Sequence, residues 1–307
     1  MEPILEVKNV SKVYGTRYVL RNINFNIFAG EIFGFIGPNG AGKSTLMRII
    51  TGMSTPTDGD VKICGYSVQQ DFEKAIINIG ATIENTNLYG YMTAKQNLTY
   101  YASLYTNVSP SRIIETLELV GLKDRMNDPI KDYSLGMRQK IGLAQALLHE
   151  PKLLILDEPT NGLDAESVIH LRQILRTLAA ERNIAVLLSS HNLSEVEQLC
   201  DTIAFVDHGS VIETQTMNKI KKETSESSRF KIRLNYPNYS AKMIFLKFNV
   251  PVEVVGDSVL VPCEDTLLPK ILDALRARDI QVYAINVETK SLEDLYIDII
   301  KSHNHTK

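Results

Sequence analysis

The feature of the sequence that most limits the possible folds is a glycine-rich stretch at residues 37–45. It follows an apolar run at 32–36 and precedes another at 46–50, a pattern typical of a strand, a phosphate-holding loop and a helix. The glycines allow successive backbone N–H groups to turn toward one anion, and the N-terminus of the helix adds partial positive charge. We therefore predict a nucleoside triphosphate site formed by Gly37, Pro38, Asn39, Gly40, Ala41, Gly42, Lys43, Ser44 and Thr45.

Three side chains in and before this stretch are candidates for contacts with the nucleotide. Lys43 is expected to reach the outer phosphates, and the hydroxyl of Ser44 is expected to ligate Mg²⁺. Residues 3–10 and 18–27 alternate apolar and polar side chains, which predicts two strands. Tyr14 lies between these strands and could stack on an adenine, although packing within the turn is the commoner role of such a ring.

Length and composition are those of an ordinary globular protein. The 307 residues are about twice the length of a typical domain, so we expect one large and one small domain. The 33 basic and 36 acidic residues give a formal net charge of −3 without a long basic run, which does not favour nucleic acid as a partner. The cysteines lack the spacing of a metal site and are expected to be reduced thiols: Cys64, Cys200 and Cys263.

The sequence also bears on location. No apolar stretch is long enough to cross a bilayer. The N-terminus lacks the basic and apolar regions of a signal peptide. We therefore expect a cytoplasmic chain, unless a partner holds it at a membrane.

A mainly helical segment, from Thr93 to about Leu148, interrupts an α/β pattern. Ser109 and Pro110 are typical of a helix start, and Gly121 is expected to end that helix. Before this segment, residues 79–87 read as a strand that leads into a polar loop.

Two adjacent acids follow a strand that is predicted to be buried on both faces. Four apolar residues at 153–156 precede Asp157 and Glu158. An acid in this position can simply cap the next element, but in a chain with a phosphate loop the pair is better explained by binding Mg²⁺ and handling water. A second buried strand at 184–190 ends at His191. A lone histidine is usually structural, but open α/β sheets bind ligands at the carboxyl ends of their strands.

The last part of the chain is organised differently. Residues 218–228 are polar and charged and are predicted to be a linker. From residue 229 the expected order is strand, helix, two strands, helix and strand, which predicts a small ferredoxin-like α+β domain. A last helix is expected to begin at Ser291, with Asp294 as its capping partner. No site chemistry is visible here, so packing, dimerisation or regulation is the predicted role.

Four further motifs follow the phosphate loop in order. They are Tyr-Ser-Leu-Gly-Met-Arg-Gln at 133–139, the strand and acids at 153–158, Asn-Gly-Leu-Asp at 161–164, and His191. Together with the loop they resemble the motifs of an ATP-binding cassette (ABC) transporter ATPase subunit. The resemblance extends from residue 3 to about residue 215.

This resemblance implies a fold and a division into domains. The fold is an α/β P-loop NTPase cassette with a mixed central sheet, an antiparallel β subdomain and a helical subdomain at about 88–148. The cassette would occupy residues 1–217, followed by the linker and by an accessory domain at 229–307.

The resemblance also implies roles within one subunit. Tyr14 matches the adenine-stacking position, and the glycine loop would wrap the phosphates of ATP. Asp157 would support Mg²⁺, and Glu158 would polarise the attacking water. His191 would contact the γ-phosphate.

Other matched residues imply a second subunit. In this family Ser134 and Gly136 touch the nucleotide that is bound by the other subunit, and Asp164 bridges the two subunits near each site. Ser134 also begins a helix, so its hydroxyl and the free N–H groups of the first turn can face a phosphate. Two chains would thus sandwich two ATP molecules in a homodimer.

One position departs from the family pattern. Glu84 stands where the family usually has Gln, at the end of the strand before the helical segment. A carboxylate ligates Mg²⁺ at least as readily as an amide, so a metal role for Glu84 is expected to survive, while the coupling step is altered. Together with the C-terminal domain and the ending at 291–296, this variant is similar to the bacterial bacitracin and lantibiotic self-protection branch.

The expected function is the motor subunit of a membrane exporter, held at the inner face of the membrane by separate permease chains. The helical segment and the loop at 85–92 are the expected docking region. One alternative is a soluble ABC ATPase that acts on ribosomes or DNA, although such members have two fused cassettes or long coiled coils. Another is a nucleotide-dependent regulatory module whose C-terminal domain binds a ligand.

Overall fold

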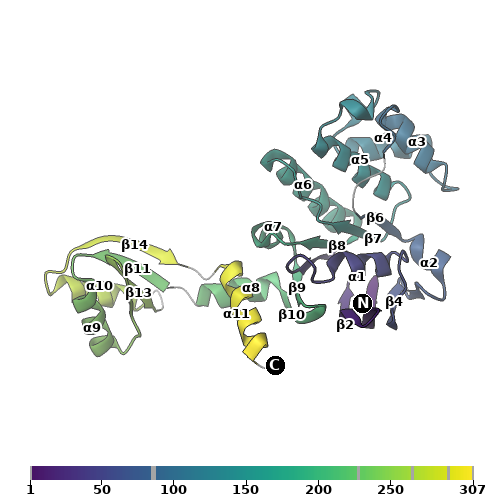
Figure 1. Cartoon of the computed structure of the whole chain (residues 1–307). Helices are drawn as coiled ribbons and strands as arrows, with labels where there is room; N and C mark the ends of the chain where they lie inside the picture. Colours follow the sequence, from purple (N-terminus) through teal and green to yellow (C-terminus); the bar gives the residue numbers. More distant parts are fainter. Residues whose placement is uncertain (1, 84–87, 227–228, 264–265, 289–290, 306–307) are drawn as a thin grey trace. The chain divides into compact units, whose positions relative to one another are not determined.

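A computed structural model describes residues 2–83, 88–226, 229–263, 266–288 and 291–305 (Figure 1). The chain divides into two compact units, one ending at Thr216 and the other beginning at Met217.

The first unit is built on a six-stranded mixed sheet in the order β10-β9-β3-β8-β7-β6. All neighbouring strands are parallel except β10, which returns antiparallel to β9. Strands β3 and β8 are buried along their whole length, as expected where both faces of a parallel sheet are covered. The carboxyl ends of β3, β8 and β7 therefore lie side by side. The strands are β3 (Ile32–Ile36), β6 (Ile79–Thr82), β7 (Leu153–Asp157), β8 (Ala185–Ser190), β9 (Thr202–Asp207) and β10 (Ser210–Thr216).

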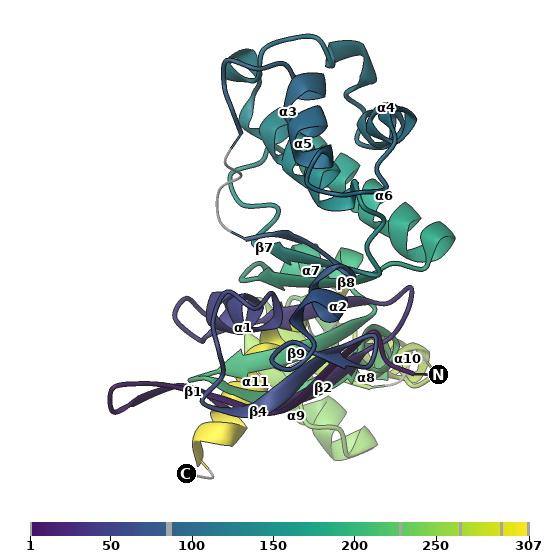
Figure 2. The same ribbon diagram turned by 90° about the vertical axis from the view of Figure 1, so that its right-hand side faces the viewer.

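An antiparallel sheet in the order β2-β1-β4-β5 packs against the first sheet. Helix α1 (Lys43–Ile50) lies between the two sheets and buries Leu46 and Met47 in their common core (Figure 2). The rings of Phe25 and Phe33 stack across the sheets with centroids 5.0 Å apart. The strands are β1 (Leu5–Tyr14), β2 (Arg17–Ile27), β4 (Asp58–Ile63) and β5 (Tyr66–Ser67).

The predicted helical segment forms a group of helices beyond β6 and β7 (Figure 2). Ser109 caps α4 by accepting a hydrogen bond from the N–H of Arg112, and Pro110 is the first residue of that helix, as predicted. Gly121 follows the helix with a positive φ of 72°. The helices of this unit are α2 (Phe72–Ile76), α3 (Ala94–Ala102), α4 (Pro110–Leu119), α5 (Leu135–Leu147), α6 (Ala165–Arg182) and α7 (Leu193–Leu199), with 3₁₀ turns at Lys123–Arg125 and Ile130–Asp132.

The second unit has an antiparallel sheet in the order β12-β13-β11-β14. Its strands and helices follow one another in the order expected from the sequence, while the ferredoxin-like assignment stays a prediction. Phe230 and Ile232 of β11 are buried with Ile244 and Ile271 of the two helices. The elements are β11 (Arg229–Leu234), α9 (Pro237–Phe248), β12 (Glu253–Val255), β13 (Ser258–Pro262), α10 (Leu268–Arg276) and β14 (Val282–Glu288).

A helix lies at each end of this unit in the sequence. Most of the segment predicted as a linker, 218–228, is helical and forms α8 (Met217–Glu226). Met217 and Ile220 are buried one turn apart, a spacing that the polar composition concealed. The predicted cap of α11 (Leu292–His305) is confirmed, since Ser291 and Asp294 exchange backbone-to-side-chain hydrogen bonds. Among the described residues, no helix is both long and apolar enough to span a bilayer.

Candidate nucleotide site

The predicted phosphate loop lies between β3 and α1, and its glycines are required by its geometry. Gly42 precedes α1 with φ 102°, and a Cβ there would lie 2.8 Å from the Val19 carbonyl oxygen. A Cβ at Gly37 would lie 2.3 Å from the carbonyl oxygen of Val206. No described side chain caps α1, so the first N–H groups of this helix are available to an anion.

Lys43 is buried within the loop. Its Nζ donates to the carbonyl oxygens of Gly37 at 2.8 Å and Pro38 at 3.3 Å. The same Nζ lies 3.4 Å from Oε1 of Glu158, which comes from the end of β7. The structure therefore brings the loop lysine and the second predicted acid together across the carboxyl ends of the parallel strands.

His191 also meets this carboxylate. Its Nδ1 lies 2.6 Å from Oε2 of Glu158, so one oxygen of the acid faces Lys43 and the other faces the imidazole. The Glu158 side chain is 23% exposed, and that of His191 is 50% exposed. A carboxylate that is held in this way and is still reachable by water can orient a nucleophile.

The two acids are anchored by a residue that the sequence reasoning missed. The hydroxyl of Ser189, on β8, donates to Oδ1 of Asp157 and accepts from the backbone N–H of Glu158 at 2.9 Å. Glu158 itself has a left-handed φ of 49°, which is unusual for a residue with a side chain. The only sequence signal was two serines at the end of an otherwise apolar strand.

The donors near the loop fit a magnesium ion. Asp157 offers a carboxylate at the end of β7, and Ser44 offers a hydroxyl in the first turn of α1. Across the described ranges, no three His, Cys, Asp or Glu side chains gather as a metal cluster. Sparse protein ligation is usual for Mg²⁺, which keeps waters and uses substrate phosphates as ligands.

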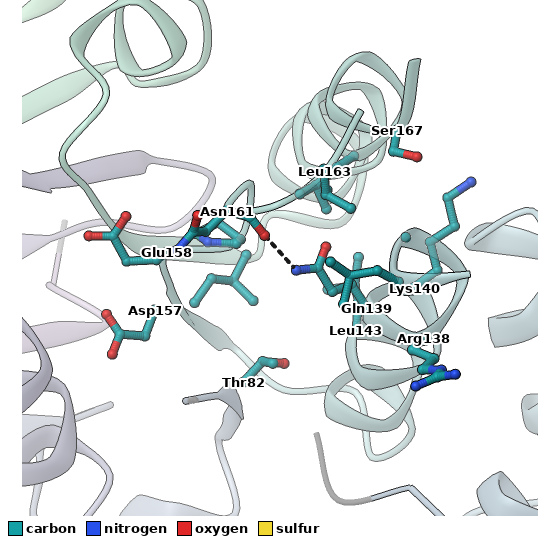
Figure 3. A pocket seen from close by; sticks show the side chains of 15 residues that line it. Thr82, Arg138, Gln139, Lys140, Leu143, Asp157, Glu158, Asn161, Leu163 and Ser167 are labelled. Carbon is teal, nitrogen blue, oxygen red and sulfur yellow. Dashed lines mark hydrogen bonds between the residues drawn. The ribbon is translucent and has the colours of Figure 1, made fainter. Parts of the chain in front are cut away.

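A cavity of about 540 Å³ separates the acids from the helical group (Figure 3). Asp157 and Glu158 lie on one side, while Gln139 and Leu143 of α5 lie on the other, and Gly136 is also among the lining residues. Gln139 crosses this space, and its Nε2 donates to the carbonyl oxygen of Asn161 at 3.3 Å. Gln139 was not predicted as a site residue, although it belongs to the motif at 133–139.

The motifs that are implied to face a second subunit begin two adjacent helices. Ser134 caps α5 by accepting from the N–H of Met137 at 3.2 Å, and Asp164 caps α6 by accepting from the N–H of Ser167 at 2.7 Å. The hydrogen bond from Ser167 lowers the pKa of the Asp164 carboxyl, which keeps it ionised. A Cβ at Gly136 would lie 2.8 Å from Oγ of Ser167, so the two helix starts are in close contact. Ser134 and Asp164 are both exposed.

Two predicted site residues are not joined to this cluster. Tyr14 ends β1, with its ring half exposed and the Nζ of Lys12 4.9 Å from the ring centroid. Its role in stacking on adenine stays a prediction. Glu84 lies outside the described residues, so its role as a metal ligand also stays a prediction.

A phosphate loop that faces two acids and a histidine at the ends of parallel strands defines a nucleotide-hydrolysing protein. The family model described as ABC transporter matches residues 20–161. The bacitracin transport ATP-binding protein BcrA of Bacillus licheniformis is 34% identical over 302 residues, covering 98% of each chain. The lantibiotic transport ATP-binding protein SrtF of Streptococcus pyogenes is 42% identical over 210 residues, covering 68% of this chain and 89% of SrtF.

A solved structure gives the same result. The ATP-binding cassette MJ0796, described as a dimer in a post-hydrolysis state bound to ADP and Pi, has a TM-score of 0.63 and 28% identity, covering 69% of this chain and 98% of MJ0796. The chain belongs to the family of ABC transporter ATP-binding proteins, and it is an ATPase. The family assignment and the cassette fold predicted from the sequence are therefore confirmed.

Proposed function

We propose that this chain is the ATP-hydrolysing subunit of a membrane exporter that gives resistance or immunity to a peptide antibiotic of the bacitracin or lantibiotic type. Relatives named for bacitracin and lantibiotic transport support this proposal, and BcrA matches along nearly the whole chain. The observation that carries the catalytic part is the placement of the Glu158 carboxylate between Lys43 and His191.

The chemistry follows from this placement. The N–H groups of the glycine loop and the Lys43 ammonium would hold the phosphates, and Tyr14 would stack on the adenine. Glu158 would accept a hydrogen bond from the attacking water, while His191 keeps the carboxylate in position. Mg²⁺, held by Ser44 and Asp157, would neutralise charge on the phosphates.

We propose that the active form is a homodimer with two sandwiched nucleotides. The exposed starts of α5 and α6 would supply Ser134 and Gly136 to the nucleotide of the partner chain, with Asp164 between the subunits. The similarity to a cassette described as dimeric supports this arrangement. ATP binding would close the dimer, and hydrolysis would reopen it.

A tyrosine surface on the helical group is the proposed docking site for the permease. The ring of Tyr89 makes edge contacts with Tyr91 and Tyr100 at centroid distances of 6.0 Å and 5.3 Å. Tyr91 is 75% and Tyr100 46% exposed, and both line a groove with Met92 and Lys95. Large exposed aromatic side chains of this kind are typical anchors of protein interfaces. Docking there would place the chain at the inner face of the membrane.

The alternative of action on ribosomes or DNA is not favoured, because the relatives described above are named for transport. A ligand-binding regulatory role for the second unit stays a separate hypothesis. It predicts that deleting residues 229–307 changes the response of the ATPase to an added effector.

The dimer is tested with the Glu158→Gln variant, which should bind ATP and hydrolyse it slowly. Light scattering with saturating Mg-ATP should give the mass of two chains, and without nucleotide the mass of one. A strictly monomeric variant under both conditions, and also in detergent-extracted membranes, would contradict the proposed sandwich.

The docking surface and the transported class are tested in the native cells. Replacing Tyr91 and Tyr100 by Ala should remove the chain from the membrane fraction, whereas the same change at two exposed tyrosines of the second unit, Tyr236 and Tyr239, should not. Deleting the chain should lower resistance to bacitracin or to a lantibiotic. If resistance to both is unchanged, the transported class is wrong and the ATPase assignment stands.

A further inference from the structure

We propose that Ser189 is a positioning residue for ATP hydrolysis, which uses one hydroxyl to fix both the Asp157 carboxylate and the backbone of Glu158. This inference rests on the proposed roles of the two acids. It adds Ser189, on β8, to the residues that arrange the catalytic site.

Strand pairing fixes the position of Ser189 in the sheet. Its Cα is in register with Asp157 on β7 and with Phe35 on β3, so it lies at the centre of the parallel strands. Side chains in register on neighbouring strands point to the same face of a sheet. The hydroxyl of Ser189 is therefore directed at Asp157 by the strand pairing itself.

The Ser189 hydroxyl both donates and accepts a hydrogen bond. Ser189 donates its only proton to Oδ1 of Asp157 and accepts the N–H of Glu158 at 2.9 Å. A hydroxyl can donate and accept at once, which no apolar side chain of this size can do. Ser189 is 0% exposed, so water does not readily replace the lost partner when the hydroxyl is removed.

The backbone of Glu158 has an unusual conformation. Its φ of 49° is disfavoured for a residue with a Cβ, so the surrounding structure must hold it there. The N–H bond to Ser189 restrains the same residue whose carboxylate meets Lys43 and His191. Without it, the backbone of Glu158 is freer to leave the conformation that aims its carboxylate.

The neighbouring serine shows that this role is specific. Ser190 is also buried, but its hydroxyl accepts from the N–H of Asn192 at 2.9 Å within its own turn. Successive side chains of a strand point to opposite faces, so Ser190 does not share the direction of Ser189. The proposal therefore applies to Ser189 alone.

The experiment compares Ser189→Ala, Ser189→Cys and Ser189→Thr with the parent chain. Partners that orient metal ligands typically contribute about 10- to 100-fold in metal affinity or activity. We expect Ser189→Ala to lower kcat or raise the Mg²⁺ concentration for half-maximal activity by about this factor, with little change in the KM for ATP. Cys fills the site but bonds weakly and should resemble Ala, whereas Thr keeps the hydroxyl and should restore most of the activity.

The matched control is Ser240→Ala, which removes an equally buried serine hydroxyl from the second unit. Parent values of both kcat and the Mg²⁺ dependence in Ser189→Ala and Ser189→Cys would overturn the proposal, as would an equal loss in Ser240→Ala. In a Glu158→Gln background, Ser189→Ala should cost less than it does in the parent, because the two residues act as a unit. If Ser189→Ala lowered kcat in the Glu158→Gln background by as much as it does in the parent, the proposal would also be contradicted.

The roles of Glu158 and Ser189 can be tested separately. If Glu158→Gln hydrolyses ATP like the parent, the proposed role of Glu158 is wrong. If that variant is slow while Ser189→Ala is fast, only the positioning role of Ser189 is wrong.

Discussion

His191 Nδ1 and Glu158 Oε2 lie 2.6 Å apart, although 33 positions separate the two residues in the chain. Because Lys43 lies 3.4 Å from the other oxygen, the carboxylate of Glu158 is restrained from two sides. The parallel pairing of β7 and β8 makes this possible, since it brings their carboxyl ends to the same edge of the sheet.

We expect Glu158→Gln to separate binding from hydrolysis. The amide keeps the shape of the side chain but cannot accept a proton, so turnover should fall by roughly 10²- to 10⁴-fold, the usual share of a general base. ATP affinity should stay close to that of the parent. Phosphate release and equilibrium nucleotide binding measure the two quantities, and unchanged turnover would remove Glu158 from this role.

Lys43→Ala is expected to act on binding itself. Loss of a charge-assisted hydrogen bond to phosphate costs about 1.5–3 kcal/mol, or roughly 10- to 150-fold in affinity. Calorimetric titration with ATP checks this value. Lys74→Ala, at an exposed surface ion pair, is the control and should bind like the parent. Equal affinities in all three proteins would show that the loop assignment is wrong.

Gly136→Ala should destabilise the contact between the starts of α5 and α6. The added Cβ would lie 2.8 Å from Ser167 Oγ, and overpacking of this kind costs about 1–3 kcal/mol. Denaturant unfolding should show the loss, and the double variant with Ser167→Ala should recover part of it. A single variant as stable as the parent would mean that the two helix starts separate freely.

His149 should make the stability of the chain depend on pH. Burial lowers the pKa of this imidazole below its ordinary value of 6.5, so the unfolded chain takes up its proton first. Stability is therefore present above pH 6.5 and lost as the pH falls from 6.5 toward the lower folded value. His149→Gln should flatten this part of the profile, because Gln does not titrate.

Unfolding curves between pH 5 and pH 8 provide the measurement for His149. His208→Gln controls for the loss of a histidine at an exposed turn. If His149→Gln retains the slope of the parent below pH 6.5, another group is responsible for it.

Much of the site could be read from local sequence. The phosphate loop is a continuous segment whose glycines are required by positive φ angles and close backbone contacts. Its motif can therefore be recognised without knowing which distant residues it contacts. The caps at Ser109 and Ser291 were likewise predictable, because each involves residues at most three positions apart. The buried strands were predictable from their continuous apolar runs.

Other features arise from long-range pairing. Gln139 bonds to Asn161 and Ser189 bonds to Glu158, and each pair is distant in the sequence. The residues next to Gln139 and Ser189 in the chain therefore do not predict these hydrogen bonds. The polar composition of 218–228 did not show that most of this segment forms a helix, in which Ile220 and the preceding Met217 are buried.

The phosphate loop and the ordered motifs already identify a nucleotide-binding cassette in the amino-acid sequence, because they depend on local backbone requirements. The shared contact of Lys43 and His191 with the Glu158 carboxylate is visible only in the folded chain. The physical reason is that hydrogen bonds and ion pairs act over a few ångströms, and only the register of the parallel strands brings these side chains within that distance.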